Sequence, residues 1–391
     1  MYIPYGKQSI SEEDIQSVVD VLESDWLTQG PVVPNFESEV ARIVGCKHAV
    51  ASNSATSSLH LACRALEIGK GDLVWTSPIS FVASSNCALY CGANIDFVDI
   101  DIKTYNMDVC KLEEKLELAK ANDNLPKCVI PVHLAGRSCD MASIFKLSKK
   151  YGFKIIEDAS HGVGASYQKT KVGSCRYSDI TVFSFHPVKI ITSGEGGMAL
   201  TNDHSLATKM ALLRSHGITR DEKIMDNISD GSWYYEQLDL GFNYRLTDIA
   251  AALGLSQLNR LSAFVEQRNA IADRYDELLA DSNFILPSRD SDSLSSFHLY
   301  IIRIESSNPG QMHKALFEKL RSSGVGVNLH YIPIYRHPYY QKIGFDYALY
   351  PASEAYYKSA ISIPMFPGLS YEEQDFVVKV LQNPSGYQNI F

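Results

Sequence analysis

Residues 179–201 read DITVFSFHPVKIITSGEGGMALT and place one lysine between two short apolar runs. The runs, Ile180 to Phe185 and Met198 to Thr201, have the length expected for buried strands. A polar loop with Lys189 follows the first run, and a turn with three glycines precedes the second. Lys189 is therefore predicted to lie in a loop between two buried strands.

A lysine in this position should be poorly solvated. Its pKa should fall, because burial disfavours the charged amine, and a neutral amine can attack a carbonyl carbon. This chemistry suits a lysine that holds an aldehyde cofactor as a Schiff base. The alternative is a surface lysine in a loop between strands, and residues 179–201 alone leave both possibilities open.

The composition predicts an ordinary globular protein. The chain has 391 residues, of which 45% are hydrophobic and 21% charged, so it is long enough for two domains. We expect a large domain at residues 1–250, which includes an N-terminal arm, and a smaller α+β domain at residues 251–391. The net charge of −9 and the pI of about 5.7 argue against a nucleic-acid partner.

The first residues, MYIPYGKQ, contain no apolar signal core, and no apolar run approaches the ~20 residues that span a bilayer. We therefore expect a cytoplasmic protein without a membrane partner. The eight cysteines are scattered without a Cys-x-x-Cys pair, which predicts reduced, mostly buried thiols. Cys87 and Cys91 lie four apart on a predicted helix, but no further metal ligands are near them, so no metal site is predicted.

Strands and helices alternate through the first half of the chain. This alternation, with short links, predicts a mostly parallel sheet covered by helices, with the ligand at the carboxyl ends of the strands. Predicted strands are 49–51, 72–76, 95–98, 128–133 and 153–157, and predicted helices are 11–23, 36–44, 54–67, 80–90, 108–121 and 141–151. Later come a helical region at 247–279, a loop at 288–296, a strand at 298–304, a helix at 311–322 and a strand at 325–330.

Two polar positions are candidates for binding a phosphate group. Ser54-Ala55-Thr56 opens a predicted helix, whose free N–H groups and positive dipole end attract anions. Ser184 lies at the end of the strand before Lys189, and its hydroxyl could donate to the same phosphate. The alternatives are a plain helix N-cap and a serine on the solvated side of a strand.

Two more positions are candidates for holding an aromatic ring. Asp158 follows the strand at 153–157, and a carboxylate there would keep a pyridine nitrogen protonated, which makes the ring an electron sink. Glu157 should point to the other face of the sheet, because strand side chains alternate. Phe81 follows a strand and could stack on a planar ring. The alternatives are a turn-capping aspartate and a core phenylalanine.

These features occur in the order phosphate-binding helix, stacking aromatic, carboxylate, serine and lysine. The order resembles that of the aspartate-aminotransferase fold, PLP-dependent transferase fold type I, which binds pyridoxal phosphate (PLP). The chain is similar, over nearly its whole length, to the DegT-type sugar nucleotide aminotransferases. The matching segments are Trp26-Leu-Thr-Gln-Gly-Pro31, Asn53-Ser-Ala-Thr56, Ser80-Phe-Val-Ala83, Pro131-Val-His-Leu-Ala-Gly136, Glu157-Asp-Ala-Ser-His161, Phe183-Ser-Phe-His186 with Lys189, Glu195-Gly-Gly197 and Gly241-Phe-Asn-Tyr-Arg245.

Within that family the chain most resembles the C4 aminotransferases of pseudaminic acid biosynthesis. Close relatives share several of the segments that carry this second likeness. They are Ser77-Pro-Ile-Ser-Phe81, residues 183–197, Leu213-Arg-Ser-His-Gly217 and His330-Tyr-Ile-Pro-Ile-Tyr335.

The resemblance implies a role for each matching residue. Lys189 would form the Schiff base with PLP, and Asp158 would pair with the pyridine nitrogen. Ala55, Thr56 and Ser184 would hold the phosphate, and Phe81 would stack on the ring. His161 stands where many relatives carry Gln and would meet the ring oxygen of the cofactor. Asn243 would reach the phosphate of the neighbouring subunit's cofactor, which implies a homodimer with a shared active site.

The resemblance also implies a reaction. The amino group of L-glutamate would pass to C4 of a UDP-linked 4-keto-6-deoxy N-acetylhexosamine, giving UDP-4-amino-4,6-dideoxy-N-acetyl-β-L-altrosamine by ping-pong kinetics. Arg245 and His330 could complement carboxylate or diphosphate charge. The implied substrate site, between subunits, lies near Tyr5, Trp26, Thr28, His186, Arg245, His330 and Tyr331.

Four alternatives stay open. The acceptor could be another nucleotide-linked keto sugar, aminated at C4 or C3, and the donor could be glutamine. The chain could be a PLP-dependent sugar dehydratase, although relatives of that kind carry His where this chain has Lys189. It could also be a regulator that kept the PLP fold and lost turnover, but such a chain should have lost its Lys, Asp or phosphate-binding residues.

Overall fold

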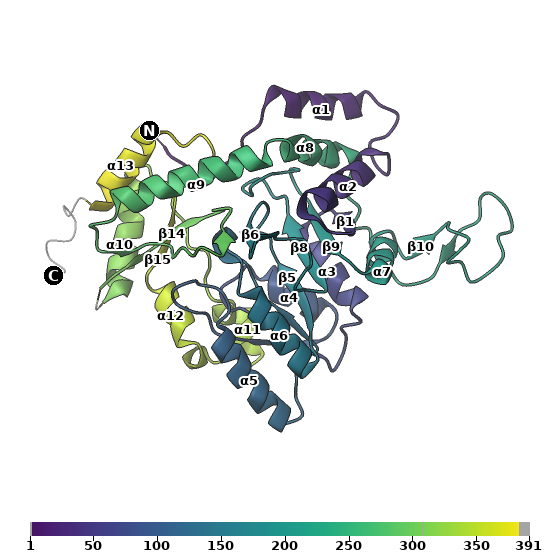
Figure 1. Cartoon of the computed structure of the whole chain (residues 1–391), viewed down its shortest axis with the longest axis horizontal. Helices are drawn as coiled ribbons and strands as arrows, with labels where there is room; N and C mark the ends of the chain where they lie inside the picture. Colours follow the sequence, from purple (N-terminus) through teal and green to yellow (C-terminus); the bar gives the residue numbers. More distant parts are fainter. Residues whose placement is uncertain (1, 307, 383–391) are drawn as a thin grey trace.

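The computed structural model describes residues 2–306 and 308–382, and its centre is a seven-stranded sheet (Figure 1). The strand order is β1-β9-β8-β5-β4-β2-β3. All neighbours from β8 through β5, β4 and β2 to β3 pair in parallel, whereas β9 runs antiparallel to β8 and β1. The strands are β1 (His48–Ser52), β2 (Leu73–Thr76), β3 (Asn94–Phe97), β4 (Cys128–Ile130), β5 (Lys154–Asp158), β8 (Ile180–Ser184) and β9 (Gly197–Thr201).

Helices cover both faces of this sheet, which confirms the predicted α/β class and the mostly parallel sheet. The helices are α2 (Val32–Val44), α3 (Ala55–Ala65), α4 (Ala83–Tyr90), α5 (Val109–Ala121), α6 (Met141–Tyr151), α7 (His204–Arg214), α8 (Asp248–Leu258) and α9 (Leu261–Leu278), and α1 (Glu12–Leu22) packs against α8. The predicted region 247–279 is thus two helices, and the helix expected from residue 80 begins at Ala83.

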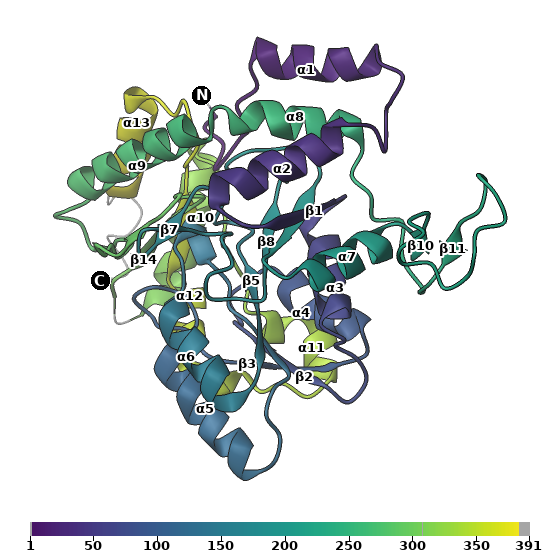
Figure 2. The ribbon, with the colours of Figure 1, turned by 45° about the vertical axis from the view of Figure 1, so that its right-hand side comes forward.

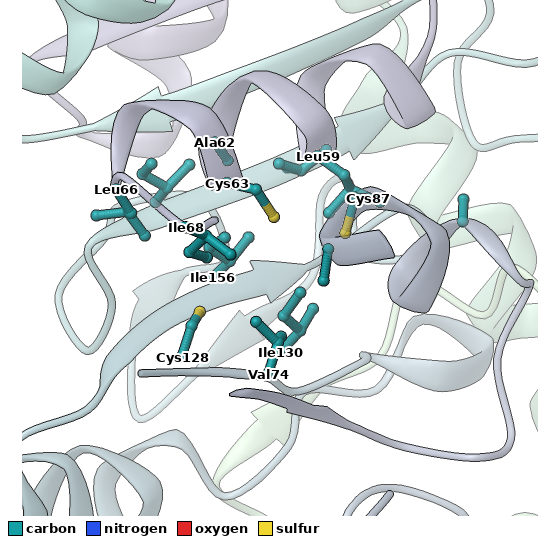
Figure 3. Packing of buried hydrophobic residues seen from close by; sticks show 14 of the residues in the cluster. Leu59, Ala62, Cys63, Leu66, Ile68, Val74, Cys87, Cys128, Ile130 and Ile156 are labelled. Carbon is teal, nitrogen blue, oxygen red and sulfur yellow. The ribbon is translucent and has the colours of Figure 1, made fainter. Parts of the chain in front are cut away.

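The faces of the sheet are set by the alternation of side chains along each strand. Ile156 packs with the buried residues of α3, α4 and α7 (Figure 3), whereas its neighbour Ile155 packs with those of α5 and α6. The side chains of β4 divide in the same way, with Ile130 on the first face and Val129 on the second. Each strand is apolar on both sides because helices bury both faces.

A smaller antiparallel sheet, in the order β12-β14-β15, forms the C-terminal part with its own core. Its strands are β12 (Phe284–Ile285), β14 (Tyr300–Ile304) and β15 (Ala360–Ile363). The helices of this part are α10 (Pro309–Ser322), α11 (Pro338–Lys342), α12 (Pro351–Tyr357) and α13 (Tyr371–Gln382). Its core includes Ile3 from the start of the chain, while Ile334 and Tyr335 pack into the core of the large sheet.

The strand predicted at residues 325–330 is absent, so this prediction was wrong. The segment alternates apolar and polar residues, but it makes only two isolated bridges, one from Val325 to Ile3 and one from Asn328 to Ser362. Two different partners each pair one residue, so no continuous ladder forms. The peptide bond between His330 and Tyr331 is cis.

Several short strands lie outside the two sheets described above. A segment with β10 (Ile218–Thr219) and β11 (Glu236–Gln237) projects from the body of the molecule (Figures 1 and 2). The others, β6 (Ser166–Tyr167), β7 (Thr170–Lys171) and β13 (Ser293–Leu294), form a small sheet that includes part of the predicted loop 288–296. Within residues 2–306 and 308–382, no helix combines the length and apolarity that a membrane crossing needs.

Candidate active site

A cavity of about 1130 Å³ opens at the carboxyl ends of β5 and β8. This is the position expected for a ligand site in an open parallel sheet, and the volume is large enough for a cofactor together with a substrate. Asp158 and Ser184, the last residues of these two strands, line the cavity. Further lining residues are Tyr5, Asn53, Ser54, Ala55, Thr56, Ser57, Phe81, His161, His186, Lys189, Glu195, His298, Asn328, His330 and Tyr331.

One end of the cavity is formed by the N-terminus of α3. Ser54 caps the helix by accepting a hydrogen bond from the Ser57 N–H at 3.1 Å, and Ala55 and Thr56 follow it into the first turn. Gly197 lets β9 approach this turn, since a Cβ there would lie 2.4 Å from the Ala55 nitrogen. The helix dipole and the first-turn N–H groups suit a phosphate at this end of the cavity.

Asp158 is held by hydrogen bonds on both carboxylate oxygens. Ser84 of α4 donates to Oδ2 at 2.6 Å, and the Ser160 N–H donates to Oδ1 at 3.1 Å. Ser80 and Ser84 lie 2.6 Å apart, so Ser80 can in turn donate to the Ser84 oxygen. Hydrogen bonds to a carboxylate favour its charged form, which is the form that can pair with a protonated pyridine nitrogen.

Glu157 lies on the opposite side of β5, as the alternation of the strand predicts. Its carboxylate is 2.7 Å from His133 Nε2 and accepts hydrogen bonds from Ser178 and Thr181. Glu157 is not among the cavity-lining residues. Asp158 thus lines the cavity and Glu157 does not, and the role of Asp158 toward a pyridine nitrogen stays a prediction.

Lys189 reaches the cavity from the loop after β8 and is not a lysine of the outer surface. Burial lowers the pKa of its amine to about 8, although the negative charge of Asp158 acts in the opposite direction. The nearest side-chain partner is His298, whose Nε2 lies 3.5 Å from Lys189 Nζ. An amine with this pKa is neutral in an appreciable fraction of molecules near pH 7, and can therefore act as a nucleophile.

Phe81 lies in the loop before α4 and lines the cavity. Phe81 is 58% exposed, so it is not a residue of the hydrophobic core. Its ring centroid lies 6.1 Å from that of Tyr331. A ring in this place is free to stack on a planar ligand, as predicted.

His161 already has partners on both ring nitrogens. Nδ1 accepts the Ala135 N–H at 3.3 Å, so the neutral ring carries its proton on Nε2 and donates it to the Tyr331 hydroxyl at 3.0 Å. Burial, and then the charge of Lys189, hold the pKa of His161 well below its usual range. The predicted hydrogen bond from His161 to a cofactor oxygen would therefore compete with Tyr331.

The structure divides the predicted substrate residues, together with the predicted phosphate-binding residue Asn243, into two groups. Tyr5, His186, His330 and Tyr331 line the cavity, whereas the cavity lining within residues 2–306 and 308–382 does not include Trp26, Thr28, Asn243 or Arg245. Thr28 forms a bridge with Thr247, and Asn243 forms one with Ser215.

His330 is neutral in this setting, so it can offer hydrogen bonds but no positive charge. Burial, and then the charge of Lys189, lower the pKa of His330 to about 3. Its Nδ1 lies 2.8 Å from Ser362 Oγ, which orients the ring. The part of the prediction in which His330 complements an anionic charge is therefore limited to hydrogen bonding.

Sequence reasoning missed two residues of this site. Ser84 supports Asp158, and its position four residues after Ser80 near the start of a helix was a usable signal. His298 contacts Lys189, but its local sequence, Phe297-His-Leu-Tyr300, resembles that of any strand beginning. Only the fold brings His298 to the lysine loop.

A model of the DegT/DnrJ/EryC1/StrS aminotransferase family matches residues 8–382. The chain belongs to this family. As a member of the DegT/DnrJ/EryC1/StrS family it is a PLP-dependent sugar aminotransferase of fold type I.

Individual relatives match over nearly the whole chain. The spore coat polysaccharide biosynthesis protein SpsC of Bacillus subtilis is 38% identical over 385 residues, which are 98% of this chain and 97% of SpsC. The UDP-4-amino-4,6-dideoxy-N-acetyl-beta-L-altrosamine transaminase of Campylobacter jejuni is 38% identical over 380 residues, 97% of this chain and 96% of the relative. The structure of Helicobacter pylori PseC, an aminotransferase of pseudaminic acid biosynthesis, superposes with a TM-score of 0.89 at 34% identity, covering 97% of this chain and 98% of PseC.

The residues of the cavity fit PLP. The N-terminus of α3 and Ser184 suit its phosphate, Asp158 suits its pyridine nitrogen, and Lys189 suits its aldehyde. The charge pattern agrees, because the single carboxylate that ends β5 faces the single amine of the loop after β8.

Proposed function

We propose that this aminotransferase transfers the amino group of L-glutamate to C4 of a UDP-linked 4-keto-6-deoxy N-acetylhexosamine, giving UDP-4-amino-4,6-dideoxy-N-acetyl-β-L-altrosamine for pseudaminic acid biosynthesis. The observation that carries the chemistry is the placement of Lys189, with its pKa lowered to about 8, in the same cavity as Asp158. The relatives from Campylobacter jejuni and Helicobacter pylori support the choice of sugar.

Each residue has a defined task in this proposal. Ala55, Thr56 and Ser184 bind the phosphate of PLP, Phe81 covers the ring, and Asp158 holds the proton of the pyridine nitrogen. PLP, when bound, supplies the electron sink that stabilises negative charge on the reacting carbon. Lys189 Nζ accepts a proton from the reacting carbon and later returns it. The amine must be uncharged when it accepts that proton.

The substrate is bound, in this proposal, by the outer part of the cavity. Tyr5, His186, His330 and Tyr331 offer hydroxyl and imidazole groups to the sugar and its diphosphate. The positive charge that the diphosphate needs would come from Arg245, supplied by a second subunit together with Thr28.

A shared active site explains why Asn243, Thr28 and Arg245 lie outside the cavity of one chain. The projecting segment beside them exposes large apolar side chains, among them Ile228 at 93%, Trp233 at 73% and Leu240 at 73%. Apolar side chains gathered on a projecting segment are typical of a surface that packs against a partner. We therefore propose a homodimer in which Asn243 reaches the neighbouring cofactor phosphate.

Mixing two inactive variants tests the shared site. Lys189→Ala and Asn243→Ala proteins, refolded together, should form hybrid dimers with one intact site, giving about a quarter of wild-type activity. Activity no higher than the sum of the separate variants would show that each chain builds its own site. Refolded Lys189→Ala mixed with itself is the control.

The sugar is tested with a coupled assay. The protein, PLP and glutamate are offered UDP-linked 4-keto-6-deoxy N-acetylhexosamines of the L-altro-type series, inverted at C5, and of the D-gluco-type series, and the products are analysed by mass spectrometry. Amination of the C5-inverted isomer alone supports the proposal. Amination of only the other isomer leaves an aminotransferase of a different pathway.

A second candidate is amination of another nucleotide-linked keto sugar, at C4 or C3. It is favoured by SpsC, a spore coat polysaccharide protein that is as similar to this chain as the altrosamine transaminase is. A small difference in the sugar is decided by few contacts, so similar overall identity does not choose between them. Absence of product from both isomers, with an intact spectral response to glutamate, would favour this candidate.

A further inference from the structure

His298 is a buried histidine that contacts Lys189 in the wall of the cavity. It lies two residues before β14, its Nε2 is 3.5 Å from Lys189 Nζ, and only 4% of the residue is exposed. Its ring centroid lies 4.3 Å from that of His161. None of the tasks proposed above uses this residue.

Arg268 fixes His298 from behind. Arg268 belongs to α9, is 1% exposed, and donates from one guanidinium nitrogen to the carbonyl oxygens of Phe297, His298 and Met365 at 3.1, 3.3 and 3.1 Å. Three backbone acceptors on one buried donor hold the segment before β14 in place. The guanidinium charge also opposes a second positive charge on the imidazole.

His298 is therefore neutral near pH 7. Burial is the largest cause that holds its pKa well below the usual range, and the charge of Lys189 is the second. His161 and Arg268 act in the same direction. A neutral imidazole has one N–H and one lone pair, so it can either donate to a neighbour or accept from it.

The second ring nitrogen leaves His298 free to change between these two roles. Nδ1 is buried and has no hydrogen-bond partner within residues 2–306 and 308–382. When Lys189 is charged, Nε2 can accept a hydrogen bond from the ammonium group while Nδ1 carries the ring proton. When Lys189 is neutral, Nε2–H can donate to the lone pair of the amine. Neither arrangement breaks another hydrogen bond of the ring.

We infer that His298 is a positioning residue that holds the Lys189 amine, in both of its charge states, whenever that amine is not bonded to the cofactor. The inference rests on the proposed role of Lys189. A lysine that transfers protons must be kept beside the reacting carbon after its release, and the long lysine side chain has many competing rotamers. One hydrogen bond to a fixed ring restricts them.

The other groups that face Lys189 do not replace His298. Asp158 contributes a negative charge, and no other side-chain hydrogen bond joins the Lys189 amine to the residues that the structure describes. His161 and His330 are occupied by Tyr331 and Ser362. The titratable groups around Lys189 are Asp158 on β5, His161 after β5, His186 in the same loop, His298 before β14 and His330 in the segment after residue 325, with Arg268 behind His298.

The test measures the protonation of Lys189 in the apoprotein, without cofactor or turnover. Trace acetylation from pH 6 to 11, followed by mass spectrometry of the peptide with Lys189, gives the titration midpoint. The wild type should titrate near pH 8. His298→Phe should shift the midpoint down by about one pH unit. Both charge states of the amine lose a hydrogen bond, but the bond of the charged amine is the stronger one because it is charge-assisted.

Two matched variants separate positioning from packing. His298→Gln keeps a hydrogen-bonding group, so its Lys189 midpoint should lie close to that of the wild type. His313→Phe removes a part-buried histidine of α10, which bonds the Ala360 carbonyl oxygen at 2.8 Å, and should leave the midpoint of Lys189 unchanged. A His298→Phe protein with native circular dichroism and an unshifted midpoint would overturn the inference.

A measurement on the wild type covers the case in which His298→Phe does not fold. Imidazole 15N shifts report the tautomer of each histidine, and His298 should change tautomer near pH 8 while staying neutral. The change should vanish in Lys189→Ala. A His298 signal that stays constant from pH 6 to 10 would contradict the inference. Failure of the proposed function would appear separately, as a missing spectral response to glutamate in a protein whose Lys189 titrates near pH 8 and whose His298 changes tautomer at the same pH.

Discussion

Gly197→Ala should weaken the binding of PLP by moving the N-terminus of α3. The added methyl group would lie 2.4 Å from the Ala55 nitrogen and from the Ser54 carbonyl carbon. Both are backbone atoms, so no side-chain rotation relieves the overlap. Since carbon contacts are comfortable only near 3.5 Å, the first turn of α3 must retreat by about 1 Å. The strand β9 cannot move away instead, because it is hydrogen-bonded to β1 on one side and to β8 on the other.

A retreat of this size would break one of the hydrogen bonds that we assign to the phosphate. Each bond to a charged group contributes about 1.5–3 kcal/mol, so the dissociation constant of PLP should rise about 10- to 100-fold. The overlap should also lower the free energy of unfolding by about 1–3 kcal/mol. The assay is a titration of apoprotein with PLP, followed by the absorbance of the bound cofactor.

The matched control for this experiment is Gly69→Ala, where an added Cβ would meet no atom within 4 Å. It should bind PLP as the wild type does. A folded Gly197→Ala protein with a dissociation constant within about twofold of the wild type would refute the placement of the phosphate at α3.

Three further changes test the roles of the cavity residues. Lys189→Ala should abolish turnover, whereas Asp158→Asn should retain PLP and slow the glutamate half-reaction by orders of magnitude in stopped-flow absorbance. Ser84→Ala should slow the same step about 5- to 30-fold, because Asp158 loses a hydrogen bond to its charged form, and Ser85→Ala should not. Lys189 has a lower pKa in the folded apoprotein, about 8, than in the unfolded chain, about 10.4, so the unfolded chain binds more protons between these values. The unfolding free energy from urea titrations should therefore rise between pH 8 and 10, and a Lys189→Met protein should lack this rise. If the unfolding free energies of both proteins rose equally with pH, Lys189 would not be the group with the lowered pKa.

The sheet and most of its helices could be predicted because strands and helices alternate along the first half of the chain with short links. Within a strand, neighbouring side chains point to opposite faces, as Ile155 and Ile156 do, and this placed Asp158 at the cavity and Glu157 behind it. Alternation misled the prediction at residues 325–330. There Val325 and Val327 are buried in the C-terminal core, but the backbone of the segment pairs only through single bridges with Ile3 and Ser362.

The supporting contacts of the site could not be predicted from local sequence. Ser84 meets Asp158, and His298 meets Lys189, only because α4 and β14 are brought to the ends of β5 and β8. Arg268 acts through backbone carbonyl oxygens, which leave no trace in the pattern of residue types. Such contacts depend on the relative placement of elements, which periodicity does not encode.

The burial of Ile3 in the C-terminal core links the order of synthesis to the order of folding. Ile3 is fully buried there, and its backbone bonds Gly324 and Gly326 at 2.9 and 2.6 Å. Ile3 leaves the ribosome before residues 324–326 and can therefore reach its final place only after those residues are made. A ribosome-bound chain that stops at residue 300 should expose Ile3 to proteases, even when its large sheet has already formed.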